Sequence, residues 1–200
     1  IMSDEAMIVD KTGSIFLAGS YLVKAAIGET IDNETLGGAT THCSISGVTD
    51  YKAKDDQDAL NRIKNSVGKI GDYEKAGFNR EKAEKPASDE KEIYGIIPKS
   101  RADQYDMYEI IKRLVDNSEW DEYKPDYGKT LITAYARIDG WAVGIVANQR
   151  KVVKTAKGEM QFGGAIYSDS ADKATRFIAN CKQKKIPLVF IQDVTGFMVG

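Results

Sequence analysis

The residues best suited to chemistry in this sequence are glycines in loops. One group is Gly37, Gly38 and Ala39, and the other is Gly196 with Phe197. Paired glycines let a backbone approach a ligand closely, and free N–H groups near a helix start attract a phosphate or a thioester oxygen. A tight turn or close packing would use the same glycines without any ligand, so both interpretations stay open for the first group.

Side chains offer little support for direct catalysis. His42 is the only histidine, and it has no obvious carboxylate or serine partner, which favours a structural hydrogen-bonding role. Cys43 and Cys181 lie far apart in unlike contexts, and with one histidine they cannot form a metal cluster. We therefore expect thiols without a disulfide bond, no metal, and a reducing, cytoplasmic compartment.

Composition excludes several classes of partner. The 200 residues are 42% hydrophobic, which is enough for a sizeable core, and 28 basic residues interleave with 30 acidic ones for a net charge of -2. This balance provides no broad positive field for nucleic acid or an anionic membrane, so we expect neither partner. The sequence begins and ends in the middle of patterns, and we expect it to be an internal segment of a longer protein.

The first half predicts short elements followed by a linker. Residues 6–9 and 15–18 read as consecutive strands, and residues 21–27 as a helix closed by Gly28. An amphipathic helix is expected to begin at about residue 55 and to end at Gly68 or Gly71. Residues 68–92 are rich in glycine, lysine and glutamate and poor in large apolar side chains. We interpret them as a solvated linker.

The second half predicts a helix, a hairpin, a longer helix and a buried strand. Apolar spacing from Met107 to Val115 indicates a helix, and Asp139-Gly140 between two apolar runs indicates a two-residue hairpin turn. Residues 151–162 read as a loop whose lysines either solvate it or meet phosphates of coenzyme A. A helix from about residue 168 to 185 precedes the apolar run 188–191, which predicts a central strand covered on both faces. The loop with Gly196 then lies at the carboxyl end of that strand, where open α/β sheets place ligand sites.

Several multi-residue segments resemble one family. Residues 164–178, 186–189 and 193–200, together with residues 2–6, 15–19, 22–26, 36–39 and 116–124, resemble the carboxyltransferase (beta) subunit of biotin-dependent acyl-CoA carboxylases. The ending Gly196-Phe197-Met198-Val199-Gly200 is similar to the methylcrotonyl-CoA type. The resemblance implies an α/β ClpP/crotonase-like fold of repeated β-β-α units. It also implies two domains: residues 1–92 would end an N-terminal acyl-CoA-side domain plus linker, and residues 93–200 would begin a C-terminal biotin-side domain.

The resemblance further implies a reaction and its partners. A carboxyl group would move from carboxybiotin, held on a biotin carboxylase or biotin carrier partner, to a methylcrotonyl- or propionyl-type acyl-CoA, through an enolate stabilised by backbone N–H groups. Gly37, Gly38 and Ala39 would serve the acyl-CoA side, and Gly196 and Phe197 the biotin side, while the oxyanion donors would lie outside these 200 residues. The protein would be a homo-oligomer, a hexamer built from dimers, in the cytoplasm or, in a eukaryote, the mitochondrial matrix.

Other functions stay open beside this one. A biotin-dependent acyl-CoA decarboxylase subunit of the glutaconyl type, or another crotonase-fold acyl-CoA enzyme, would carry similar segments. A non-catalytic scaffold is the alternative from a different class. Dependence on a biotinylated carrier separates the carboxylases and decarboxylases from other crotonase-fold enzymes, and binding of acyl-CoA separates enzymes from a scaffold.

Overall fold

A computed structural model describes residues 3–70, 79–100 and 103–198. The chain divides into two compact units, residues 1–64 and residues 65–200, and each is considered by itself. The boundary predicted at residue 92, between an acyl-CoA-side and a biotin-side domain, stays a prediction.

The first unit contains short elements around a two-stranded parallel sheet. They are β1 (Met7–Val9), α1 (Ser20–Ile27), α2 (Asn33–Gly37), a π-helical turn (Thr41–Ile45), β2 (Tyr51–Ala53) and the beginning of α3 (Asp56–Ile70). The helix α1 ends as predicted at Gly28, whose φ of 75° is the left-handed conformation that glycine adopts without strain. The small core of the first unit consists of Ile8, Ala39 and Cys43.

The prediction of a second strand at residues 15–18 is wrong. Residues 15–18 form no strand; the neighbouring Ser14 makes a single bridge to Gly38, and Leu17 is fully exposed. The partner of β1 is β2 instead, with Met7 opposite Tyr51. An apolar run of four residues gives no information about distant backbone partners, which is why the sequence favoured the nearer segment.

The second unit is built on a four-stranded sheet in the order β3-β4-β5-β9. The strands are β3 (Trp120–Glu122), β4 (Leu131–Ile138), β5 (Trp141–Asn148) and β9 (Leu188–Ile191); β9 is parallel to β5, and the other pairs are antiparallel. The hairpin between β4 and β5 turns at Asp139-Gly140 as predicted, with φ of 51° and 79° at the two turn residues. These values suit the two-residue turns that match strand twist.

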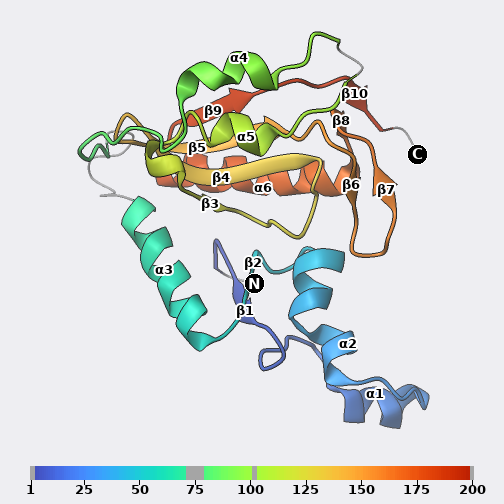
Figure 1. The fold of residues 1–200 in the computed structure, drawn as a ribbon. Helices are drawn as coiled ribbons and strands as arrows, with labels where there is room; N and C mark the ends of the chain where they lie inside the picture. Colours follow the sequence, from blue (N-terminus) through green and yellow to red (C-terminus); the bar gives the residue numbers. More distant parts are fainter. Residues whose placement is uncertain (1–2, 71–78, 101–102, 199–200) are drawn as a thin grey trace. The chain divides into compact units, whose positions relative to one another are not determined.

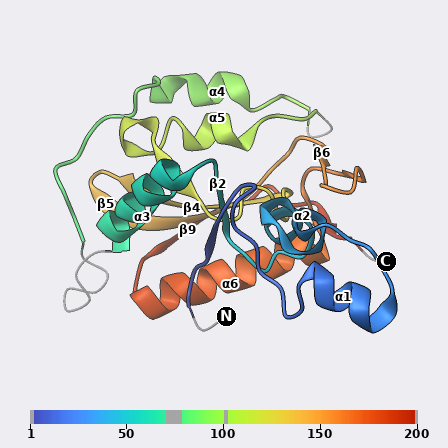
Figure 2. The ribbon, with the colours of Figure 1, turned by 90° about the horizontal axis from the view of Figure 1, so that it is seen from below.

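Two helices cover opposite faces of this sheet (Figures 1 and 2). On one face, α5 (Met107–Ile111) buries Met107, Ile110 and Ile111 against Ile132 and Ile145. The other face is covered by α6 (Ser168–Lys184).

Aromatic packing joins α6 to the sheet. The ring of Phe177 contacts those of Tyr123 and Tyr135, with centroids 5.4 and 4.9 Å apart. A side-chain carbon added at Gly144 would lie 2.6 Å from the sulfur of Cys181, so glycine is needed for the helix to approach the sheet. The predicted helix, hairpin and packing are confirmed here, and Cys43 and Cys181 are both buried thiols without a disulfide bond, as predicted.

The strand β9 differs from its prediction. Within the described residues it pairs only with β5, and the side chain of Phe190 is 51% exposed. A continuous apolar run predicts burial on both faces, but it cannot tell a central strand from the edge position that β9 occupies in this unit.

The region interpreted as a solvated linker is also partly corrected. The helix α3 continues to Ile70, and residues 71–78 lie outside the described part of the chain. Residues 79–81 bond to the hairpin: Ala142 N–H donates to Asn79 O (3.0 Å), and Glu81 N–H donates to Gly140 O (3.0 Å). These bonds join backbone groups about sixty residues apart, so composition gave no indication of them.

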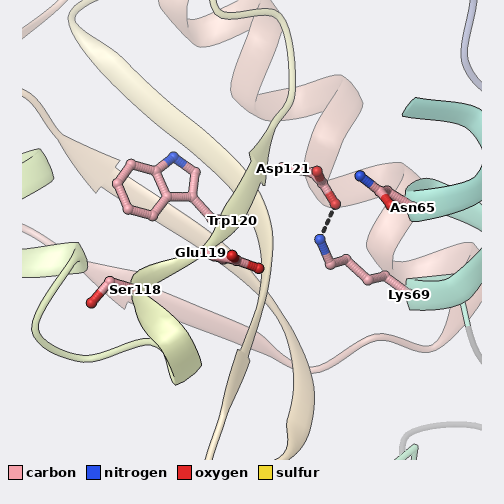
Figure 3. A pocket seen from close by; sticks show the side chains of 6 residues that line it. All are labelled: Asn65, Lys69, Ser118, Glu119, Trp120 and Asp121. Atoms are coloured by element: carbon pink, nitrogen blue, oxygen red, sulfur yellow. Dashed lines mark hydrogen bonds and ion pairs between the residues drawn. The ribbon is translucent and has the colours of Figure 1, made fainter. Parts of the chain in front are cut away.

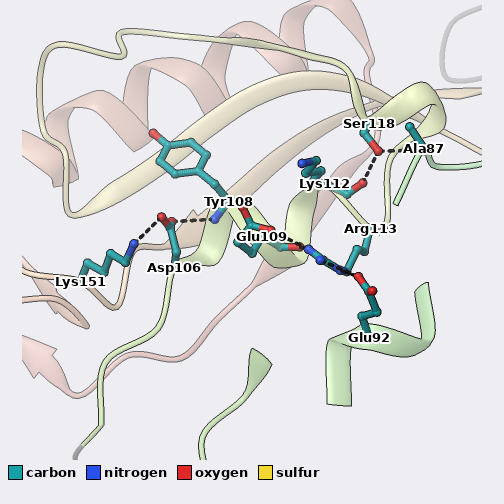
Figure 4. A network of polar contacts seen from close by, with 9 residues as sticks. All are labelled: Ala87, Glu92, Asp106, Tyr108, Glu109, Lys112, Arg113, Ser118 and Lys151. Atoms are coloured by element: carbon teal, nitrogen blue, oxygen red, sulfur yellow. Dashed lines mark hydrogen bonds and ion pairs between the residues drawn. The ribbon is translucent and has the colours of Figure 1, made fainter. Parts of the chain in front are cut away.

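Residues 87–92 continue this attachment along the segment that follows α5. The Ala87 N–H donates to Ser118 Oγ at 2.9 Å, and Arg113 pairs with Glu92 at 2.7 Å (Figure 4). A short 3-10 turn (Glu90–Glu92) lies in this range and α4 (Ile93–Ile96) follows it, so the ordered structure predicted from residue 93 begins earlier in the chain.

Short strands lie at the carboxyl end of the sheet. Residues 151–162 form a hairpin of β6 (Val153–Lys154) and β7 (Met160–Gln161) rather than an irregular loop. The strands β8 (Ala165–Ile166) and β10 (Gly196–Phe197) pair in parallel. None of the described helices combines the length and the apolar character needed to cross a bilayer.

Candidate functional site

The glycine pair of the first unit is packed closely against its own chain. A side-chain carbon at Gly37 would lie 2.2 Å from the carbonyl oxygen of Ile15. The Gly38 N–H donates to Glu34 O at 2.8 Å, and Ala39 is fully buried. Close packing therefore explains these glycines without a ligand. Their role on the acyl-CoA side stays a prediction.

His42 has the structural environment that the sequence favoured. Its Nε2 lies 2.6 Å from Ile15 O, and its Nδ1 lies 3.0 Å from Ser46 Oγ. Both ring nitrogens thus hold local structure together, and neither contacts a carboxylate among these partners.

The second predicted site, the biotin-side loop, consists of residues 193–198. Thr195 N–H donates to Gly164 O (2.7 Å), and Met198 N–H donates to Ile166 O (2.8 Å), which fixes its backbone beside β8. A side-chain carbon added at Gly196 would meet nothing within 4 Å, and Phe197 is 76% exposed. The loop therefore presents open space over Gly196 beside an aromatic ring.

A charged cluster that sequence reasoning missed anchors this loop. Arg150 Nε lies 3.3 Å from Asp193 Oδ2, and the Tyr105 hydroxyl donates to the same oxygen at 2.9 Å. Burial, followed by the hydrogen bond to Asp193, raises the pKa of Tyr105 to about 12, so this hydroxyl stays protonated and can donate at neutral pH. Only the position of Asp193 directly after a strand could have indicated it.

Gly164 makes room for the guanidinium of Arg150. Its φ is 78°, and an added side-chain carbon would lie 2.0 Å from Arg150 Nη1. We expect Gly164→Ala to displace Arg150 and to lower the free energy of unfolding by about 1–3 kcal/mol, because the backbone conformation also disfavours alanine. Chemical denaturation of the whole protein measures this change. Gly95→Ala, in open space on α4, is the matched control, and an equal loss in both variants would contradict the prediction.

An open cavity of about 450 Å³ lies beside β3. Its lining residues are Asn65, Lys69, Ser118, Glu119, Trp120 and Asp121. Lys69 of α3 and Asp121 of β3 point toward each other and form an ion pair across it (Figure 3). Because the Lys69 ammonium is paired with Asp121 and the remaining charged residue of the described lining is Glu119, the cavity offers no feature suited to an anionic ligand.

A buried ionic cluster lies between β3, β4 and α6. Lys173 Nζ donates to Leu131 O at 2.9 Å and lies 3.8 Å from Glu122 Oε1, and the Tyr108 hydroxyl donates to Glu122 at 2.8 Å. Burial lowers the pKa of Lys173 to about 8 and raises the pKa of Glu122. The tyrosine ring stacks on Trp120, with centroids 6.1 Å apart. The cluster fixes β3 and α6 to the sheet.

The structure thus places the two predicted groups in different units. Gly37, Gly38 and Ala39 belong to the first unit, while Gly196 and Phe197 belong to the second, with Arg150 and Asp193. In the described ranges, no group of three or more histidine, cysteine, aspartate or glutamate side chains is placed to hold a metal ion.

A β-β-α-β unit of the crotonase-like α/β fold is present in the second unit. It consists of the β4–β5 hairpin, the crossover through α6 and the parallel strand β9, with the biotin-side loop after it. The chain belongs to the carboxyl transferase domain family, which matches residues 1–200. It is 44% identical over 199 residues to the biotin-dependent 3-methylcrotonyl-coenzyme A carboxylase beta1 subunit of Mycobacterium tuberculosis, covering 100% of this chain and 35% of that protein. It therefore spans about a third of the length of such relatives.

Other relatives agree with this family. The methylcrotonoyl-CoA carboxylase beta chain of Arabidopsis thaliana, a mitochondrial protein, is 43% identical over 205 residues, covering 100% of this chain and 32% of that protein. The methylmalonyl-CoA decarboxylase subunit alpha of Propionigenium modestum is 33% identical over 205 residues, covering 100% of this chain and 37% of that protein. Among solved structures, transcarboxylase 12S with methylmalonyl-coenzyme A matches with a TM-score of 0.86 at 30% identity, covering 99% of this chain and 37% of that chain.

Proposed function

We propose that the whole protein is the carboxyltransferase component of an acyl-CoA carboxylase. It would move a carboxyl group from carboxybiotin on a partner carrier to an acyl-CoA of the methylcrotonyl or propionyl type. The observation that carries this proposal is the 44% identity, along the full chain, to a methylcrotonyl-CoA carboxylase beta1 subunit. The partners would be a biotin carboxylase and biotin carrier subunit, and the protein would be a homo-oligomer, in line with the hexamer assembly of transcarboxylase 12S.

The described residues fit the biotin ring on one side of such a site. The open space over Gly196 and the exposed rim of Phe197 and Met198 suit a flat ring with an apolar face. Biotin, when bound, supplies a nitrogen that carries the carboxyl group. Phe197 would contact the ring, and the backbone of residues 195–198 would set its distance from β8.

Backbone N–H donors would supply the chemistry. An enolate formed from the thioester places negative charge on its oxygen, and a fixed donor aimed at that oxygen stabilises the transition state by about 3–4 kcal/mol. No side-chain nucleophile is required by this scheme. We place Gly37, Gly38 and Ala39 on the acyl-CoA side, and the oxyanion donors in parts of the protein beyond this sequence.

The test uses the whole protein with its carboxylated biotin carrier. Labelled carboxyl groups should pass to methylcrotonyl-CoA or propionyl-CoA, and omission of the carrier should abolish the transfer. No transfer to any acyl-CoA from a fully charged carrier would contradict the proposal. The name of the Arabidopsis relative supports a mitochondrial location in a eukaryote, and we propose the cytoplasm otherwise.

A biotin-dependent decarboxylase subunit is the second candidate, supported by 33% identity to the Propionigenium decarboxylase subunit. A second assay separates the two, because carboxyl transfer from a charged carrier is reversible and needs no ATP in either case. Given a carboxylated acyl-CoA without ATP, ADP or phosphate, the whole complex should release CO2 if it is a decarboxylase and should not if it is a carboxylase. The higher identity to carboxylase subunits favours the first candidate.

We expect Gly196→Val to slow carboxyl transfer about ten- to a hundredfold while leaving the KM for acyl-CoA unchanged. Valine would place its side chain in the open space over Gly196, where the biotin ring would lie, and the φ of 159° at this position also disfavours a branched side chain. Steady-state kinetics on the whole protein measure both parameters. Gly95→Val, also in open space, is the control, and an unchanged rate with a raised acyl-CoA KM would place Gly196 on the other side of the site.

A further inference from the structure

The biotin-side loop combines an apolar surface with a charged base. Val194, Phe197 and Met198 are 42%, 76% and 45% exposed, whereas the side chain of Arg150 at the base is only 9% exposed. Exposed apolar side chains bury little surface, so they contribute little free energy toward holding the loop in one conformation. Other contacts have to fix the position of the loop. The backbone bonds to Gly164 and Ile166 set one part of the loop.

Asp193 sets the other part, where the chain leaves β9. Its carboxylate forms an ion pair with Arg150, which follows β5. It also accepts a hydrogen bond from the hydroxyl of Tyr105, which precedes α5. Two segments far apart in sequence thus converge on one oxygen, 3.3 and 2.9 Å away. The side chain of Arg150 is 9% exposed and that of Asp193 is 47% exposed, so solvent screens this ion pair only in part, and the Tyr105 hydrogen bond adds a second contact to the same oxygen. A lone surface ion pair would not hold a loop in this way.

From this geometry we infer that Arg150 and Tyr105 are positioning residues that act through Asp193. They hold residues 194–198 in the conformation that receives the biotin ring of the carrier. The inference rests on the proposed function for the identity of the ligand, while the anchoring of the loop stands on the contacts alone. Gly164 also contributes to this anchoring, since any side chain there would displace Arg150.

The first arm of the test is amide hydrogen exchange on the whole protein. Arg150→Ala should raise the exchange rates of the Thr195 and Met198 amides at least tenfold, and Tyr105→Phe, which removes only a hydroxyl, should raise them less. Amides of the β4–β5 hairpin should keep their rates. Lys154→Ala, which removes a positive charge from an exposed position on β6, is the control and should change nothing. Unchanged exchange at Thr195 and Met198 in Arg150→Ala would overturn the inference.

The second arm separates positioning from general stability. In carboxyl transfer, Arg150→Ala should raise the KM for the biotinylated carrier about tenfold and leave the KM for acyl-CoA unchanged, and Arg150→Lys should recover part of the loss. Equal changes in both KM values would show a merely structural role and overturn the positioning claim. If the unaltered protein transfers no carboxyl groups, the proposed function fails, and the exchange measurement still decides whether the cluster holds the loop.

Discussion

Replacing Lys173 by alanine should lower the free energy of unfolding by about 3–5 kcal/mol, the cost of removing one partner from a buried ion pair. The side chain is fully buried, and its ammonium group donates to Leu131 O and faces Glu122. Without it, the Glu122 carboxylate keeps only the Tyr108 hydroxyl among these partners and is left in an apolar environment. The hydrocarbon stem of lysine would also leave a cavity beneath α6.

Chemical denaturation of the whole protein measures this loss. Lys182→Ala, at an exposed position on the same helix, is the matched control and should change stability by less than about 0.5 kcal/mol. The double variant Lys173→Met with Glu122→Leu should recover much of the loss, because apolar residues of similar size can replace a buried pair. A loss as small as that of the control would show that the pair contributes nothing.

The same residue predicts a pH dependence. The pKa of Lys173 falls from 10.5 to about 8 on folding, so between these pH values the unfolded chain binds more protons at this site than the folded protein. Stability from this group therefore rises with pH over that window and is constant below it. Glu122, Asp169, Lys124 and Lys129 face the ammonium group and modify its titration. The stability difference between the unaltered protein and Lys173→Met should grow from pH 8 to pH 10, and a constant difference would contradict this.

Asp116→Ala should lower the free energy of unfolding by about 2–4 kcal/mol, since it removes a charged acceptor from several backbone donors. The nearly buried carboxylate accepts from Gly140 N at 2.7 Å, Asp139 N at 2.8 Å and Glu84 N at 3.3 Å. It thus holds the turn of the β4–β5 hairpin and the segment beside it. The Gly140 N–H is buried and would lose its acceptor without access to water.

Amide exchange and denaturation together test this second prediction. Exchange at Gly140 and Glu81 should accelerate in Asp116→Ala, because the turn and the attached segment would open together. Asp103→Ala, which removes an exposed carboxylate, serves as the control and should leave both amides protected. Protection that persists at Gly140 in Asp116→Ala would show that the hairpin turn forms without this carboxylate.

Sequence patterns predicted correctly those turns and helices that depend on residues close together in the chain. The Asp139-Gly140 dipeptide predicted the hairpin turn, where both residues have positive φ. The apolar spacing from Met107 to Val115 and that of Ala174, Phe177 and Cys181 predicted helices with the correct buried faces, although the first ends at Ile111. Separately from these patterns, multi-residue segments along most of the chain resemble one family, and that family is confirmed.

The tertiary structure decided everything that depends on partners distant in sequence. The strand β1 pairs with β2 across more than forty residues, the charged segment at Asn79 and Glu81 bonds to the hairpin, and Arg150 meets Asp193 and Tyr105. Sequence alone indicated where several helices and turns begin, because propensity and periodicity act within a few residues. The class of protein came instead from the resemblance of whole segments to a known family. Sequence alone could not determine which backbone edge or charge each segment meets, since those contacts exist only after the sheet has brought the segments together.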